Sequence, residues 1–371
     1  MKILIVCAKL NGGGAERVGV MLANGLAKRG HNVSMLSNLM VPVVYQVSEQ
    51  VKLSNLVSTN NNKFTKWFSA IKNVRKTIQK ERPDAIIGIM GLCTLISYIA
   101  NIGFKIPLVM TEHNSFERPA SAPMPLYLKV LKFYCNKLYK HITVLTEADK
   151  KAIGNRLKGI TVMPNPLQLT PVSRIPEKEK IIFAAGRLDS WHYKGLDLLI
   201  KAWGVLNRKE IYGNCQKTPA EEGWTLKIGG TGSEKSQDFL KQLCKENDVE
   251  NSVEFLGFRN DIDDLYKKAE IFVLSSRYEG FGLVLIEAMS QGCACVACDY
   301  NGRQREIILD DSMGLCCEPE DINVLAKSIG KMVSDEKYRK QVQINAVERS
   351  KHFSVENIAI KWEQYLASIV K

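Results

Sequence analysis

Short apolar runs alternate with longer amphipathic stretches along the first half of the chain. The runs KILIVCA, DAIIGIM and ITVLT are almost continuously apolar, as expected for strands that are buried on both faces of a parallel sheet. Between such runs, apolar residues recur every three or four positions, for example in RVGVMLANGLAKRG, and this spacing predicts amphipathic helices. Alternating strands and helices predict an α/β domain with a parallel sheet over residues 1–167.

A second set of the same kind follows a proline-rich segment. Residues 164–180 contain four prolines and few large apolar side chains, which is typical of a linker. Beyond it, KIIFAAG, VEFLG, EIFVLSS and ACVACD are expected strands with helical patterns between them, and further helices are expected at 335–350 and 354–370. The sequence therefore predicts two doubly wound domains, residues 1–167 and 168–353, that face a cleft.

The charge differs between the two halves. The 371 residues carry a formal net charge of +12, but residues 1–166 contribute +15 and residues 167–371 contribute −3. A basic face is therefore expected on the first domain. Nucleic-acid binding would also suit a basic domain, but no RRM, KH or helix-turn-helix signature is present, so we exclude it.

The ten cysteines and the apolar runs exclude other classes of protein. Cys293, Cys295 and Cys298 lie in a strand-like segment, and no second CxxC or His pair completes a zinc set, so buried free thiols are expected. No apolar run approaches the roughly 18–20 residues of a membrane span, and the run after Met1 is too short for a signal peptide. We expect a cytoplasmic protein.

Several loops that follow predicted strands carry candidate chemistry. The glycines of NGGGAER (11–17) allow backbone N–H groups to approach an anion at a helix start, although a plain tight turn is the alternative. Arg187 and Lys194, in GRLDSWHYKG, suit a diphosphate, although solvated loop cations are the alternative. GGTGSE (229–234) is a third such loop. In sheets of this type, ligands bind outside the carboxyl ends of the strands.

Two further loops hold a histidine and two carboxylates. His113, in TEHN, ends a predicted strand and faces the expected cleft, with a purely structural histidine as the alternative. Glu279 lies in the loop after EIFVLSS, and Glu287 lies one turn into the next helix on the face that leans toward the helix start. This placement makes a shared catalytic proton unfavourable. It suits two carboxylates that accept hydrogen bonds from sugar hydroxyls.

Taken together, these segments resemble a known family. EGFGLVLIEAM resembles the E-x7-E signature of retaining GT-B glycosyltransferases, most nearly the GT4 type, and GGGAER, TEHN, MPNP, GRLDSWHYKG and LGFRNDIDDLY occur in the matching order. The resemblance covers almost the whole chain. It implies two Rossmann-like domains, with a C-terminal helix at about 354–371 that packs back onto the first.

The resemblance also implies roles for particular residues. Arg187 and Lys194 would hold the donor diphosphate, Glu287 the ribose, and Glu279 the donor sugar, with His113 near the reacting carbon. The remaining donor-binding positions that it implies are Gly12, Gly13, Gly14, Gly230, Phe258, Arg259, Gly280, Phe281, Gly282 and Leu283. No enzymic nucleophile is visible, and the leaving diphosphate would help to deprotonate the acceptor. No metal or other cofactor is expected, since DID at 261–263 opens a helical pattern and is interpreted as a helix N-cap.

The expected substrates are a UDP-sugar and a lipid-linked or polysaccharide acceptor of bacterial surface glycan assembly, as in capsule or lipopolysaccharide biosynthesis. Basic, amphipathic segments at 63–82 and 124–141 indicate peripheral binding to the inner face of an anionic cytoplasmic membrane, unless their apolar faces belong to the domain core. A nucleotide-sugar 2-epimerase of the same fold and a non-catalytic glycan-binding protein are the alternatives. The first would need no acceptor, and the second would bind donor without turnover.

Overall fold

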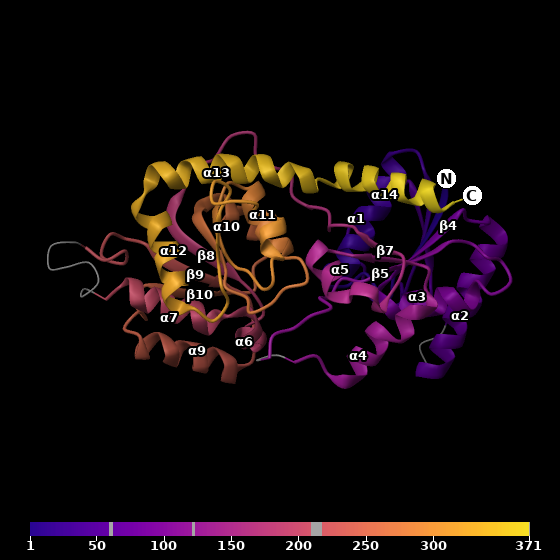
Figure 1. Ribbon diagram of the computed structural model, residues 1–371, viewed down its shortest axis with the longest axis horizontal. Coiled ribbons are helices and arrows are strands. Elements are labelled where there is room, and N and C mark those ends of the chain that lie inside the picture. Colours follow the sequence, from indigo (N-terminus) through magenta and orange to yellow (C-terminus); the bar gives the residue numbers. More distant parts are fainter. Residues whose placement is uncertain (59–61, 121–122, 209–216, 371) are drawn as a thin grey trace. The chain divides into compact units, whose positions relative to one another are not determined.

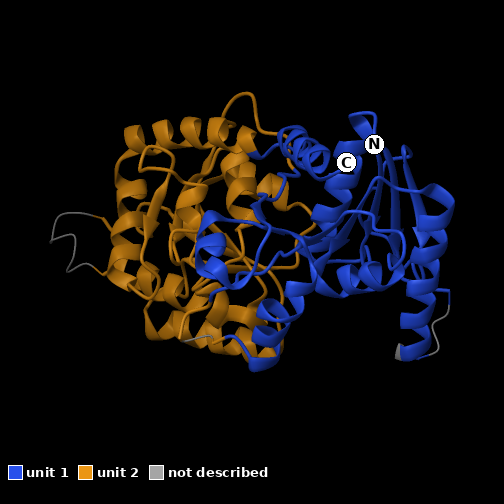
Figure 2. Cartoon of the chain, turned by 45° about the vertical axis from the view of Figure 1, so that its right-hand side comes forward, with its two compact units in different colours: residues 1–117, 124–168, 353–371 blue, residues 118–123, 169–352 orange. Residues whose placement is uncertain are grey.

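The computed structural model describes residues 1–58, 62–120, 123–208 and 217–370 (Figure 1). The chain divides into two compact units. Unit 1 contains residues 1–117, 124–168 and 353–371, and unit 2 contains residues 118–123 and 169–352 (Figure 2).

Within the described residues, unit 1 is built on a parallel sheet of seven strands in the order β3-β2-β1-β4-β5-β6-β7. The strands are β1 (Lys2–Val6), β2 (Asn32–Ser37), β3 (Val51–Asn55), β4 (Ala85–Ile89), β5 (Leu108–Thr111), β6 (His141–Val144) and β7 (Ile160–Val162). The helices are α1 (Gly14–Lys28), α2 (Lys63–Glu81), α3 (Met90–Ala100), α4 (Leu126–Phe133), α5 (Glu147–Ile153) and α14 (Val355–Ile369), with 3-10 turns η1 (Cys135–Leu138) and η2 (Gly154–Arg156).

Alternate residues of β1 bury themselves in two separate cores. Ile3 and Ile5 pack with α1 and α14 on one face of the sheet, and Leu4 and Val6 pack with α2 and α3 on the other. Helix α14, the C-terminal helix, therefore belongs to the core of unit 1, where it lies beside α1 (Figure 1). Gly25 of α1 permits this close approach, because a Cβ there would lie 2.8 Å from Val355.

Unit 2 repeats the plan. The part of it that the structure describes holds a parallel sheet of six strands in the order β10-β9-β8-β11-β12-β13. The strands are β8 (Glu179–Ala185), β9 (Thr225–Gly229), β10 (Val253–Gly257), β11 (Ala269–Leu274), β12 (Ala294–Cys298) and β13 (Leu315–Cys317). The helices are α6 (Trp191–Lys194), α7 (Leu196–Leu206), α9 (Glu234–Glu246), α10 (Ile262–Lys268), α11 (Leu283–Ser290), α12 (Ile322–Ser334) and α13 (Glu336–Ser350), with 3-10 turns η3 (Leu188–Ser190), η4 (Gln304–Glu306) and η5 (Lys351–Phe353), the last of which ends in unit 1.

The two faces of the unit 2 sheet are also fully covered. Helices α7, α9 and α12 bury Trp203, Leu240 and Ile329 against one face. On the other face, Phe183 and Phe272 meet Tyr266 of α10 in edge-to-face and tilted contacts. These doubly covered parallel sheets confirm the predicted α/β class, with two Rossmann-like sheets.

The structure differs from the sequence prediction in four segments. Strands β3 and β13 lie at or near sheet edges and were not predicted, because one is largely polar and the other is only three residues long. The amphipathic segment at 124–141 is not one continuous helix, since α4 ends at Phe133 and a separate 3-10 turn follows. The GRLDSWHYKG segment, taken as a loop, contains η3 and α6.

None of the helices within the described ranges is both long enough and apolar enough to cross a membrane.

Candidate functional site

Most of the predicted site residues follow the carboxyl ends of neighbouring strands. In unit 2, Arg187 and Lys194 follow β8, Gly230 follows β9, Phe258 follows β10, and Glu279 follows β11. The strand order reverses between β8 and β11, and such a switch point is where open α/β sheets bind their ligands. The loops of β8 and β11 are therefore the centre of the candidate site in unit 2.

Lys194 and Glu279 meet at this switch point. The Nζ of Lys194 donates to Oε1 of Glu279 at 2.7 Å, and the Ser276 hydroxyl donates to the same oxygen at 2.7 Å. Both side chains are partly exposed, so a ligand can reach the pair. The sequence predicted each residue separately, and the structure pairs them.

The sequence did not single out Arg277, which connects these two loops. Its guanidinium binds Asp197 in a bidentate manner, at 2.7 and 2.9 Å, and its Nε donates to Glu320 at 2.7 Å. Its backbone N–H donates to the carbonyl of Tyr193 at 2.9 Å. Arg277 is buried, so this ion pair is shielded from water and fixes the segment before Glu279 against the segment before Lys194.

Gly195 allows the two loops to touch. Its φ is +61°, in the left-handed region, and a Cβ there would lie 1.8 Å from the carbonyl oxygen of Ser275. The Ser275 hydroxyl also donates to the carbonyl of Lys194 at 3.0 Å. A side chain at position 195 would therefore separate Lys194 from the β11 loop.

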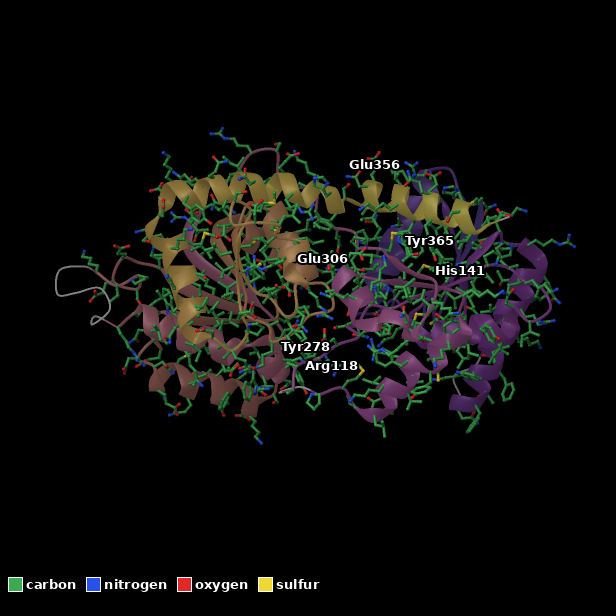
Figure 3. All side chains as sticks on the ribbon, viewed as in Figure 1. Arg118, His141, Tyr278, Glu306, Glu356 and Tyr365 are labelled. Carbon is green, nitrogen blue, oxygen red and sulfur yellow. The ribbon has the colours of Figure 1, made fainter. Side chains whose placement is uncertain are left out.

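Tyr278, which directly precedes Glu279, lies close to Arg118 (Figure 3) and also contacts the Tyr193 ring. The Arg118 guanidinium lies 5.0 Å from its ring centroid, and the Tyr193 ring meets it edge-to-face at 5.8 Å. Burial raises the pKa of the Tyr278 hydroxyl, and the nearby Arg118 partly offsets this rise. Tyr278 is therefore neutral at physiological pH.

Arg187 extends from the β8 loop into solvent, on the same loop as Asp189. Asp189 accepts hydrogen bonds from the backbone and hydroxyl of Ser233 and from the Ser236 hydroxyl, at 2.7 to 2.9 Å. These bonds, more than the Arg187 charge, hold the pKa of Asp189 below its ordinary value. They tie the β8 loop to the β9 loop. At Gly230 a Cβ would lie 1.9 Å from the carbonyl oxygen of Gly186.

Glu287 lies inside the unit. The residue is 4% exposed, and its Oε2 lies 3.5 Å from the hydroxyl of Tyr266. Any ligand hydroxyl that bonds to this carboxylate has to enter a nearly closed space. The two glutamates of the signature therefore differ in surroundings, with Glu279 open at the loop and Glu287 enclosed.

The residues between them form the turn into α11. Gly280 is half-buried, Phe281 is buried, and Gly282 has a φ of +94° at the N-cap of the helix. Leu283 is the first helical residue, so its backbone N–H belongs to the unpaired first turn of the helix. The Phe281 side chain is part of the core, so at this position only the backbone is suited to contact a ligand.

The turn after β10 leads into α10 and carries Phe258 and Arg259. Phe258 is 73% exposed, and the Arg259 guanidinium binds the Asp261 carboxylate, with Nε at 2.8 Å. Asp261 does precede α10, but its side chain makes no capping bond to that helix. The interpretation of DID as the start of a helix is confirmed, since Asp261 is the N-cap residue of α10, but its carboxylate binds the adjacent guanidinium instead of the helix backbone.

In unit 1, the glycine loop lies at the switch point between β1 and β4. Gly12 and Gly13 have φ of +144° and +110°, and Gly14 begins α1. The Glu16 carboxylate lies against Gly13, where a Cβ would be 2.2 Å from its oxygen, and the Tyr45 hydroxyl donates to the Gly13 carbonyl at 2.9 Å. An anion at the Gly13 N–H would require the Glu16 side chain to move.

His113 follows β5 and has both ring nitrogens engaged. Nδ1 lies 3.2 Å from Oδ1 of Asn165, and Nε2 lies 3.0 Å from the Thr111 hydroxyl. Burial lowers the pKa of His113 to about 4, so the imidazole is neutral at physiological pH. A substrate hydroxyl that bonds to His113 must share or replace one of these partners.

The thiols behave as predicted. Cys293, Cys295 and Cys298 are buried and free, and burial raises the pKa of Cys293 to about 11. Cys298 lies 3.8 Å from Cys317, sulfur to sulfur, without a disulfide. Among the residues that the structure describes, no three His, Cys, Asp or Glu side chains are grouped to hold a metal ion.

Comparison with known proteins agrees with this geometry. Residues 168–349 match the model "Glycosyl transferases group 1", and residues 12–170 match "Glycosyltransferase Family 4". An uncharacterized glycosyltransferase of Haemophilus influenzae is 30% identical over 360 residues, which cover 95% of this chain and 96% of that protein. The chain belongs to this family of glycosyltransferases.

A characterized relative and a solved structure extend the comparison. The GalNAc-alpha-(1->4)-GalNAc-alpha-(1->3)-diNAcBac-PP-undecaprenol alpha-1,4-N-acetyl-D-galactosaminyltransferase of Campylobacter jejuni is 28% identical over 377 residues, covering 100% of this chain and 99% of that protein. The crystal structure of Anabaena Alr3699/HepE in complex with UDP superimposes with a TM-score of 0.76 at 21% identity, covering 100% of both chains. The latter likeness shows the shared GT-B fold.

Proposed function

We propose that this protein is a retaining glycosyltransferase that moves a hexose or N-acetylhexosamine from a UDP-sugar to a lipid-linked or polysaccharide acceptor in bacterial surface glycan assembly. The observation that carries the proposal is the Lys194–Glu279 pair at the switch point of unit 2, with Arg187 on the same loop as Lys194. A relative that acts on an undecaprenol-diphosphate-linked glycan supports the acceptor class. A fold neighbour solved with UDP supports the donor class.

The arrangement suggests how this chain performs the reaction. Lys194 and Arg187 stabilise negative charge on the departing diphosphate, an electrostatic effect that often dominates catalysis. The Glu279 carboxylate accepts hydrogen bonds from the donor sugar, and Glu287 accepts them from the ribose. When donor binds, Lys194 divides its protons between Glu279 and the diphosphate. The neutral His113 bonds to the sugar without adding charge.

Bond making and breaking occur on one face of the sugar. The acceptor hydroxyl oxygen bonds to the anomeric carbon as the bond from that carbon to the diphosphate oxygen breaks. The acceptor proton passes to the leaving diphosphate, and UDP is released. No side chain is needed as a nucleophile, and no divalent metal takes part, because Lys194 and Arg187 supply the cationic charge.

The proposed enzyme works at the inner face of the cytoplasmic membrane. Its acceptor is anchored there, and α4 and η1 expose several apolar side chains beside the exposed Lys129, Lys137 and Lys140. The exposed apolar residues are Leu126, Tyr127, Val130, Leu131, Tyr134 and Leu138, which we call the α4–η1 surface. Exposed apolar groups with flanking lysines suit an anionic bilayer surface.

The other basic segment, on α2, exposes fewer apolar side chains. On α2, Val74 and Ile78 are buried in the core of unit 1, and Trp67 and Ile71 pack against it. Among the described side chains of α2, the exposed large apolar residues are Phe68 and, one turn before it, Phe64. We therefore assign membrane contact to the α4–η1 surface.

One assay tests the proposed function. Purified protein, a panel of UDP-sugars and an undecaprenyl-diphosphate-linked glycan should release UDP and extend the glycan, with and without EDTA. Glu279→Ala should reduce turnover by at least about 100-fold, since it removes contacts to the reacting sugar and leaves Lys194 without its partner. Full activity of Glu279→Ala would refute the sugar-binding role. Turnover of a UDP-sugar without acceptor would favour an epimerase instead.

A further inference from the structure

Helix α4 buries a lysine and exposes most of its apolar side chains. Lys132 is 5% exposed, whereas Leu126 and Tyr127 on the same helix are 76% and 65% exposed. This is the reverse of an ordinary amphipathic surface helix. A buried ammonium group is costly unless its charge and its protons find partners. The contacts of Lys132 therefore show which part of the unit it stabilises.

The ammonium group of Lys132 is directed at one short loop. Its Nζ lies 2.8 Å from the carbonyl oxygen of Asn114, 3.0 Å from that of Ser115, and 3.2 Å from Oε2 of Glu112. The ammonium also lies 4.3 Å from the ring centroid of Phe116. The loop formed by residues 112–116 thus wraps around a single cation.

His113 lies in the middle of this loop. The carboxylate of Glu112, whose Oε2 faces Lys132, accepts the Asn114 N–H through Oε1 at 3.0 Å. Lys132 therefore fixes the residues on both sides of His113. The His113 ring is oriented by Thr111 and Asn165.

The far end of the loop is anchored by a second buried group. Asp149 accepts the Phe116 N–H at 2.8 Å and the Ser115 hydroxyl at 3.2 Å, and its other oxygen accepts the Thr146 hydroxyl at 2.9 Å. Glu112, Lys132 and Asp149 are all buried polar groups of unit 1. All three groups hold the loop that carries His113.

We propose that Lys132, with Glu112, is a positioning residue for the glycosyl-transfer step. It holds the backbone of the His113 loop so that the imidazole meets the reacting sugar in one orientation. The inference rests on the proposed role of His113 at the donor sugar. Buried ion pairs can often be replaced by apolar residues without loss of stability, so a role confined to stability does not explain this pair well. Loops that carry reacting groups do need such fixation.

The test compares Lys132→Met with Lys151→Met, a matched change at an exposed lysine of α5 in the same unit. With the UDP-sugar and lipid-linked acceptor above, Lys132→Met should lower kcat by roughly 100-fold, the effect of about 1 Å of misplacement. The dissociation constant for UDP should not change, because Arg187 and Lys194 lie in unit 2. The ring resonances of His113 in NMR spectra should move in Lys132→Met and stay in place in Lys151→Met.

The result that overturns the proposal is a folded Lys132→Met protein with the kcat of Lys151→Met, or a reduced kcat with unmoved His113 resonances. If Lys132→Met does not fold, Glu112→Gln replaces it. That variant keeps the side-chain shape and removes the negative charge beside Lys132, so kcat should fall and the His113 resonances should move. An unchanged kcat in Glu112→Gln refutes the proposal equally.

A third variant separates this inference from the proposed function. His113→Ala should lower kcat at least as much as Lys132→Met. If His113→Ala is slow while Lys132→Met is normal, the role of Lys132 fails and the proposed function stands. If His113→Ala turns over like the native protein, the role of His113 fails and the positioning role of Lys132 fails with it.

Discussion

At the scale of single residues, the charge state of His113 is the property on which its proposed contact with the sugar depends. Burial lowers its pKa to about 4, from an ordinary value near 6.5. We therefore expect the His113 ring to stay neutral from pH 5.5 to 8. A pH titration of the histidine ring resonances by NMR measures this directly, with His113→Asn to assign the signal.

The same shift predicts a contribution to stability. The folded-state pKa lies below the unfolded value, so the unfolded chain binds the proton more tightly. The stabilising effect is full above about pH 6.5 and is lost as the pH falls from there toward 4. A His113 resonance that titrates near 6.5 would contradict both the burial argument and the neutral role assigned to the ring.

Sequence reasoning named candidate residues but not the contacts that they make with one another. Lys194 and Glu279 were both predicted, because glycine-rich and charged loops after apolar runs mark the ends of strands. Their direct bond, and the Arg277–Asp197 pair behind it, depend on side chains 80 or more positions apart. No local sequence pattern encodes contacts between side chains so far apart in the chain. In the sequence, Lys132 is one of several lysines in a basic segment. Only the fold shows that its side chain is buried.

At the scale of elements, local periodicity was informative where a strand or helix is buried along its length. The apolar runs of β1 and β4 are long and continuous, so they were recognised. Strand β3 reads VKLSN and exposes two of its residues, so its pairing with β2 could not be seen in the sequence. Helix α4 shows a different limit. Its amphipathic pattern predicted a helix, but not which face points outward.

The α4–η1 surface gives the prediction at this scale. Replacing Leu126, Tyr127 and Leu131 with Ser should reduce binding to vesicles that contain anionic lipid by about 10- to 100-fold, because each apolar side chain contributes roughly 0.5–1 kcal/mol on partial burial. Vesicle co-sedimentation measures the change. Binding of the native protein should weaken with added salt, because the lysines act through a screened field.

A matched variant on α2 tests whether the membrane binds to the α4–η1 surface or to α2. Phe64→Ser with Phe68→Ser removes two exposed aromatic residues from the other basic segment of unit 1. Its vesicle binding should remain close to that of the native protein. If the α2 variant loses binding and the α4 variant keeps it, the membrane surface has been assigned to the wrong helix. If neither native nor variant protein binds anionic vesicles, membrane contact through protein surface is refuted.

At the scale of the whole molecule, the two units share one plan and differ in charge. Both place their loops at the carboxyl ends of a doubly wound sheet with a switch point beside the first strand. The first half of the chain is strongly basic and the second slightly acidic. The alternation of strands and helices was sufficient to predict both sheets. The identity of the transferred sugar depends on a few pocket contacts, and no regular pattern in the sequence encodes those.

The last prediction concerns which unit holds the nucleotide. A ligand that binds only the folded state stabilises it by about 2.7 kcal/mol at 100 times its dissociation constant. For a unit of this size, that corresponds to a rise in Tm of roughly 5–10 °C. UDP should produce this shift in the full chain, measured by differential scanning calorimetry. Arg187→Met with Lys194→Met should abolish most of it, because the diphosphate loses both cations, whereas Lys235→Met on the exposed face of α9 should not. A shift that survives the double variant would place the diphosphate elsewhere, and a larger shift with GDP or ADP than with UDP would overturn the donor assignment.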